Sequence, residues 1–89
     1  MEIQAQGDLE YLVRPEGVDT VVRVTPDVLR RVAAAVTDEA AVVDQSVRWL
    51  LERQDAQDLP PLIDLDDIAA AYPGFIDDLD RRLGEGSSR

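Results

Sequence analysis

The chain has 89 residues, enough for one compact domain but not for two. Its 19 acidic and 9 basic residues give a net charge of -10, which disfavours nucleic acid and membrane surfaces as partners and favours a basic protein. Cys and His are absent, which excludes disulfides, zinc sites of the Cys/His type, thiol nucleophiles and imidazole bases.

The N-terminal part of the chain is predicted to be extended. A β-hairpin is expected at residues 9–24, where two β-prone runs flank Pro15-Glu16-Gly17. In that turn Pro fixes φ and Gly accepts a positive φ. A further strand over residues 2–6 could join the hairpin through Gly7-Asp8, which has the composition of a tight turn.

The next segment has the pattern of helices. A helix is expected to begin at Thr25-Pro26-Asp27, because Thr can cap free N–H groups, Pro fits the first position and Asp suits the positive helix end. Thr37-Asp38-Glu39 could cap a second helix, but no Gly or Pro interrupts residues 27–59. Residues 26–53 therefore form either two helices or one long bent helix.

The C-terminal segment follows a polar connector that Pro60-Pro61 closes. Residues 62–83 are expected to be an acidic helical segment, with a helix start near Asp64 and a break at Pro73-Gly74. Its last helix is amphipathic, and Gly84 is expected to cap it.

These elements predict a single α+β domain over residues 1–84. Its architecture is an N-terminal β-hairpin followed by three or four α-helices, with a disordered tail over residues 85–89. No run approaches bilayer-spanning length, and the N-terminus lacks the basic segment and apolar stretch of a signal peptide. A cytoplasmic location is therefore expected, with no membrane partner.

Residues 20–53 resemble the ribbon-helix-helix module of small bacterial repressors and antitoxins. Residues 21–24 would be the strand that pairs with its twin in a dimer, Pro26 to Val36 the first helix and Asp38 to Arg53 the second. The resemblance implies a bacterial regulatory protein that forms a homodimer. On the outward strand face only Arg23 could donate to a base edge, so DNA binding is not expected.

The acidic cluster after the connector does not have the spacing of a calcium loop. Counting from Asp64, the sixth and twelfth positions are Ala69 and Phe75, where such a loop needs Gly and Glu. Helix capping explains these carboxylates, and the acidic residues of the last helix lie on a solvated face beside Arg. We therefore expect no metal, no cofactor and no catalytic residues.

Partner binding is the function that the residues favour. The segment after Pro60-Pro61 combines acidic and apolar residues, as amphipathic docking elements do, and Trp is a frequent binding hot spot. The candidate partner-binding residues are Tyr72, Phe75, Ile76, Leu79, Asp77, Asp78 and Trp49. Two alternatives stay open, since Trp49 could pack at the edge of the core and the C-terminal apolar set could dock on its own domain.

The sequence thus predicts a non-enzymatic, antitoxin-like binding or regulatory module. Its acidic segment, residues 62–83, would engage a basic partner protein. The alternative is a structural or assembly subunit that oligomerises through its central apolar helices, with the acidic residues only keeping it in solution.

Overall fold

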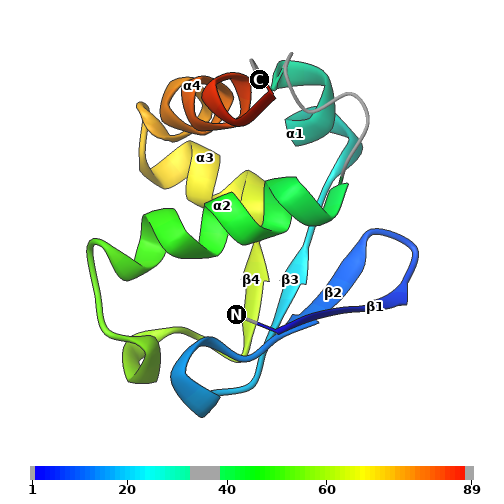
Figure 1. Cartoon of the computed structure of the whole chain (residues 1–89), viewed down its shortest axis with the longest axis vertical. Helices are drawn as coiled ribbons and strands as arrows, with labels where there is room; N and C mark the ends of the chain where they lie inside the picture. Colours follow the sequence, from blue (N-terminus) through cyan, green and yellow to red (C-terminus); the bar gives the residue numbers. More distant parts are fainter. Residues whose placement is uncertain (1, 33–38, 88–89) are drawn as a thin grey trace.

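Four strands form one mixed sheet in the computed structural model of the chain, which describes residues 2–32 and 39–87. Across the sheet they are ordered β1 (Ile3–Gly7), β2 (Glu10–Val13), β3 (Thr20–Arg23) and β4 (Leu62–Asp64) (Figure 1). The first three run antiparallel in sequence order, and β4 pairs parallel with β3. The predicted α+β class and the N-terminal hairpin are confirmed, and the further N-terminal strand is present as β1.

Strand β4 is a correction to the prediction, which made residues 62–64 the start of a helical segment. Two bonds fix it beside β3: the Thr20 hydroxyl donates to the Pro60 carbonyl at 2.5 Å, and the Val21 N–H donates to the Pro61 carbonyl at 2.8 Å. A three-residue strand is too short to show alternation, and its partner lies about forty residues earlier in the chain, so the pairing left no local signal.

The helices are α1 (Pro26–Arg31), α2 (Glu39–Leu51), α3 (Leu65–Ala71) and α4 (Phe75–Ser87), with short 3-10 turns η1 (Pro15–Gly17) and η3 (Ala56–Asp58). The predicted helix starts at Thr25 and Asp64 are confirmed. Thr25 Oγ1 accepts the Val28 N–H at 3.2 Å, and Asp64 Oδ1 accepts the Asp66 N–H at 2.9 Å. These side chains satisfy N–H groups that have no partner within the helix.

In the described part of residues 26–53 there are two separate helices, α1 and α2. Val32 has φ -100° and ψ 93°, an extended conformation that ends α1 at Arg31. The alternative of one long bent helix is therefore wrong. The predicted cap Thr37-Asp38 and the expected end of the first helix at Val36 lie outside the described residues.

The end of α4 also differs from the prediction. The helix continues through Gly84 to Ser87, so Gly84 is not its C-cap and residues 85–87 are helical, not disordered. Gly inside a helix costs about 1 kcal/mol relative to Ala, a penalty that neighbouring turns can offset. Residues 88–89 of the expected tail lie outside the described residues.

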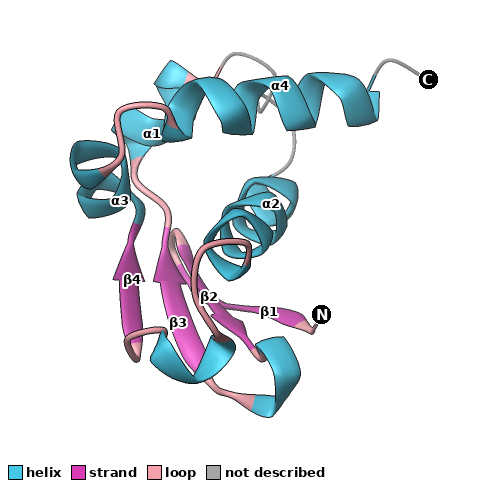
Figure 2. Cartoon of the chain, turned by 90° about the vertical axis from the view of Figure 1, so that its left-hand side faces the viewer, coloured by secondary structure: helices cyan, strands magenta, loops and turns pink. Residues whose placement is uncertain are grey.

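The core lies between one face of the sheet and the helices. Of the described helices, α2 crosses that face, while α1, α3 and α4 lie beyond the ends of β3 and β4 (Figures 1 and 2). The largest fully buried side chains are Trp49, Phe75, Leu50, Ile63, Leu65 and Leu79. Of the C-terminal apolar residues, Phe75, Ile76 and Leu79 therefore belong to the core, together with side chains from β2, β3 and α2, whereas Tyr72 does not.

Candidate functional site

Four of the predicted site residues meet around one indole. The Trp49 ring lies edge-on to Tyr72, with centroids 5.2 Å apart, and edge-on to Phe75 at 5.0 Å. Trp49 is only 2% exposed. Its Nε1–H donates to Asp78 Oδ2 at 3.0 Å, so the one hydrogen-bond donor of this buried side chain is satisfied. The structure thus joins residues from α2, α4 and the end of α3.

Arginine side chains close this cluster from outside. The Arg53 guanidinium carbon lies 3.5 Å from the Trp49 ring centroid, within the range of a cation–π interaction, and its Nη1 donates to the Trp49 carbonyl at 3.0 Å. Arg81 bonds Asp78, and Arg82 Nη2 donates to Glu52 Oε1 at 2.6 Å. The resulting network connects the C-terminal end of α2 with α4.

The two carboxylates of this network hold their charge more firmly than usual. The Trp49 and Arg81 hydrogen bonds lower the pKa of Asp78 below its ordinary value, and the Arg82 hydrogen bond lowers the pKa of Glu52. Both groups are therefore ionised near neutral pH. A pair of anions held by Arg is suited to joining helices.

Most of the predicted docking residues are not available to a partner in this conformation. Phe75 and Leu79 are completely buried and Ile76 is 9% exposed, so they pack inside the chain's own core. Tyr72, which is 40% exposed, and the exposed Asp77 remain open to solvent, and Asp78 is partly exposed. The Trp49 cluster is accordingly a contact between helices first, and the parts of it that a partner could reach are Tyr72 and the partly exposed Arg53 and Asp78.

The sheet presents two different faces. Side chains alternate along a strand, and the buried Val13, Val22 and Ile63 all point toward α2. The Tyr11 hydroxyl, on the same face, donates to Glu39 Oε1 of α2 at 2.9 Å. The residues between them point the other way, to a side that no described helix covers (Figure 2). We call this second side the open face.

An apolar row crosses the open face. Leu12 pairs in register with Val21, and Val21 with Leu62, so the three side chains stand next to one another on β2, β3 and β4. Leu12 and Val21 are half-buried and Leu62 is 46% exposed. Within the described residues, none of the three belongs to the core or to the side chains packed against it.

Two charged rows flank the apolar row. On one side Arg23 lies 3.2 Å from Glu10 and 4.0 Å from Asp64, measured between Nη and carboxylate oxygens. On the other side Arg14 Nη1 lies 3.5 Å from a Glu2 oxygen, and Arg14 Nε lies 2.8 Å from an Asp19 oxygen. Each row thus sets one Arg between two carboxylates and keeps a net negative charge.

The edges of the sheet are less suited to binding than the open face. Strand β1 is interrupted by a bulge between Ala5 and Gly7, and β4 has three residues preceded by Pro60-Pro61. Bulges, Pro and short length are the usual devices that keep a strand edge from pairing with another chain. An added strand would find only a short ladder on either side.

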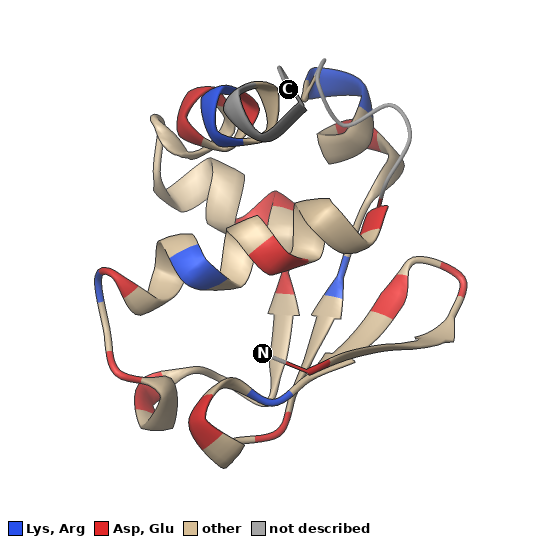
Figure 3. Cartoon of the chain, viewed as in Figure 1, with Lys and Arg blue, Asp and Glu red and all other residues tan. Residues whose placement is uncertain are grey.

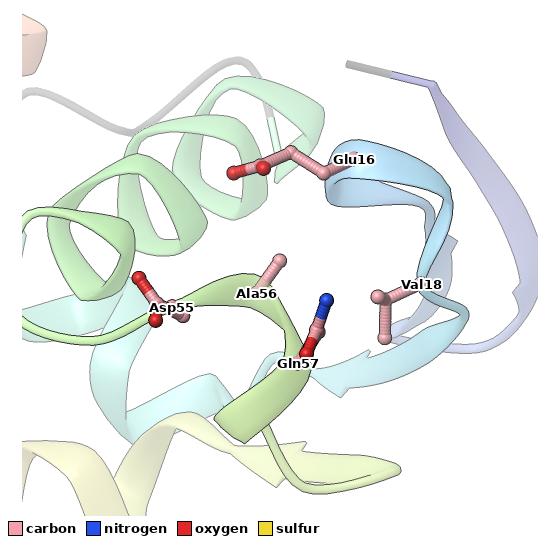
Figure 4. A pocket seen from close by; sticks show the side chains of 5 residues that line it. All are labelled: Glu16, Val18, Asp55, Ala56 and Gln57. Carbon is pink, nitrogen blue, oxygen red and sulfur yellow. The ribbon is translucent and has the colours of Figure 1, made fainter.

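A hollow of about 290 Å³ lies between the turns η1 and η3 (Figure 4). It is lined by Glu16, Val18, Asp55, Ala56 and Gln57. Its walls are polar and it is open to solvent.

Across residues 2–32 and 39–87, no three side chains of His, Cys, Asp or Glu gather where they could hold a metal ion. In the same ranges no helix has the length and apolar character needed to cross a membrane.

Part of the open face can be recognised in the amino-acid sequence. In the hairpin, Glu10, Leu12 and Arg14 alternate on one side, as do Asp19, Val21 and Arg23, so the charged and apolar rows are present in the pattern. The position of Leu62 depends on the parallel pairing of β4, which no local feature indicates. Acidic residues are spread from the hairpin to α4 and are not gathered in the C-terminal segment (Figure 3).

The structure also bears on the ribbon-helix-helix resemblance. Strand β3, the residues that would form the intermolecular ribbon, is paired on both sides within the chain, with β2 and with β4. No edge of β3 is left for a twin. Comparison of the chain with models of known protein families, with curated proteins and with solved structures finds no match.

Proposed function

We propose that the chain is a non-enzymatic protein-binding module that docks a basic partner on the open face of its sheet. The observation that carries this proposal is the apolar row Leu12, Val21 and Leu62, which stands outside the core between two charged rows. Apolar side chains gathered on a polar surface are characteristic of interaction sites, since removing their surface from water lowers the free energy.

The charge of the protein supports a basic partner. The whole chain carries -10, and both charged rows of the open face have more carboxylates than guanidinium groups. A field of one sign raises the rate of encounter with partners of the opposite sign and disfavours contact with a second copy. A regulatory role would be exercised through this contact.

The alternative function is that of an assembly subunit which oligomerises through the apolar stripe of its central helices. In α2 that stripe is not free to oligomerise, because Val42, Val43, Val47 and Leu50 are all buried in the chain's own core. Self-association would then have to use the open face as well. The test must therefore tell a second copy from another protein.

Site-directed photo-crosslinking in the host cell makes this distinction. A photoreactive amino acid is placed at Leu62 in one variant and at Tyr72 in another, because these two large apolar side chains are exposed in the described part of the chain. We expect an adduct with a different, basic protein from position 62 and none from position 72. Adducts from position 72 alone would return the function to the C-terminal segment, and an adduct of twice the chain mass would make the protein an assembly subunit.

A further inference from the structure

We infer that the occupant of the open face is an amphipathic α-helix with basic residues along both sides of its apolar stripe, laid across the strands over Leu12, Val21 and Leu62. This inference rests on the proposed function and specifies the chemistry of the partner. Three properties of the open face lead to it: the length of the apolar row, the distance to the charged rows, and the state of the charges in those rows.

The first property is length. The apolar row runs across three neighbouring strands, which are spaced about 4.8 Å apart, so its side chains extend over roughly 10 Å. Two turns of an α-helix rise about 11 Å and present three apolar side chains on one stripe. A short amphipathic helix therefore matches the row from end to end.

The second property is width. Each charged row lies two residues along the strands from the apolar row, a distance of about 6.8 Å. A helix with its side chains is about 10 Å across, so residues flanking its stripe would stand over Glu10 and Asp64 on one side and over Glu2 and Asp19 on the other. Lys or Arg at those flanking positions would meet carboxylates on both sides.

The third property is the state of the charges in the two charged rows, where each Arg is already paired with carboxylates. It argues against a second sheet as the occupant, and so against a second copy packed face to face. A sheet aligned with the strands would cover all three rows and take Arg14, Arg23 and their four carboxylates out of water. Burying ion pairs costs free energy that their attraction does not reliably return. A helix along the apolar row covers only the apolar side chains and leaves the charged groups at its wet margins.

The protein already uses this arrangement on its other face. Helix α2 lies across the strands there (Figure 1), and Val13, Val22 and Ile63 share one core cluster with its buried side chains. A partner helix on the open face would complete a layer of helix, sheet and helix.

Synthetic helical peptides test the inference with the full chain. The probe is a Leu/Lys peptide with Leu at i, i+3, i+4 and i+7 spacing. One control replaces every Lys by Glu, and another replaces every Leu by Ala. Peptide affinity is measured by fluorescence anisotropy, and the contact is mapped by backbone amide chemical shifts. We expect shifts on β2, β3 and β4 around the apolar row, and affinities at least about tenfold lower for both controls.

Two matched variants separate the open face from general attraction to an acidic protein. Glu10→Gln removes one carboxylate from a charged row, and Asp77→Asn removes one from the exposed side of α4. We expect the first to weaken Leu/Lys peptide binding about threefold and the second to leave it unchanged. Equal effects of the two variants would overturn the inference, as would shifts confined to α4 or equal affinity for the Leu/Lys and Ala/Lys peptides.

The remaining outcomes separate this inference from the function on which it rests. If the partner crosslinks at position 62 but the Leu/Lys peptide does not bind, the open face is a docking site and the helical occupant is wrong. If sedimentation shows a dimer that Leu62→Thr converts to a monomer, the occupant is a second copy and both statements fail.

Discussion

The Trp49 indole N–H donates to the Asp78 carboxylate across 3.0 Å and so links α2 to α4. This bond helps to lower the pKa of Asp78 below its ordinary value of 3.8. A depressed carboxyl pKa adds stability above the unfolded-state pKa, and that stability is lost as the pH falls through the folded-state value. The free energy of unfolding of the wild-type chain should therefore fall faster below pH 3.8 than that of Asp78→Asn.

Chemical unfolding at a series of pH values measures this difference. Asp78→Asn should be less stable than wild type at pH 7, and the gap should close in strong acid. The double variant with Trp49→Phe is the control, because without the indole donor the substitution at position 78 should change the pH profile less. A gap that stays constant down to pH 2 would show that the bond does not titrate with Asp78.

Phe75→Ala is expected to cost about 3–5 kcal/mol of stability, as removal of a large core side chain does. Phe75 is completely buried and lies edge-on to Trp49. Tyr72→Ala, on the same indole but 40% exposed, should cost about 1 kcal/mol. Denaturant unfolding of both variants decides the matter. A cost below about 1 kcal/mol for Phe75→Ala would remove this side chain from the core.

Two buried hydroxyl groups should respond to removal with opposite signs. Ser46 Oγ is fully buried and has no hydrogen-bond partner among the described residues, so Ser46→Ala should raise stability by about 1 kcal/mol. Thr20 is 1% exposed, but its hydroxyl bonds the Pro60 carbonyl, so Thr20→Val should lower stability by about 1 kcal/mol. Thermal and denaturant unfolding report both. The same sign for the two variants would mean that hydrogen bonding does not set the difference.

The parts of the fold that follow from local chemistry were predictable. Thr25 and Asp64 cap helices because their side chains accept backbone N–H groups close in sequence, and Pro15-Glu16-Gly17 turns the chain between two β-prone runs. Strand β4 was not predictable, since its three residues depend on pairing with β3 far away in the chain. The end of α4 was not predictable from Gly84, because Gly near a helix end usually caps the helix, whereas α4 continues to Ser87.

The sequence predicts the chemistry of the candidate partner better than it predicts the location of the docking surface. The net charge of -10 favours a basic partner. Sequence alone does not tell which amphipathic segment turns its apolar side chains to the core and which turns them to a partner. Phe75 and Leu79 turned inward because α4 packs on α2 around Trp49. Leu12 and Val21 face outward because the helices that the structure describes cover the other face of the sheet, which is a property of the assembled fold.

The central claim is that a partner docks on the open face and not on the C-terminal segment. Leu62 and Tyr72, 46% and 40% exposed, are the matched probes for the two surfaces. Thr replaces each of them, because it removes apolar area and suits an extended backbone, which Leu62 has in β4 and Tyr72 has at the end of α3. Unfolding free energies come first, to show that both variants fold.

The decisive measurement is the dissociation constant of the partner identified by crosslinking, for wild type, Leu62→Thr and Tyr72→Thr. The open face predicts that Leu62→Thr weakens binding about tenfold or more, as loss of an apolar anchor does, while Tyr72→Thr stays within about twofold of wild type. Unchanged affinity for Leu62→Thr together with a tenfold loss for Tyr72→Thr would contradict the account and place the interface at α4.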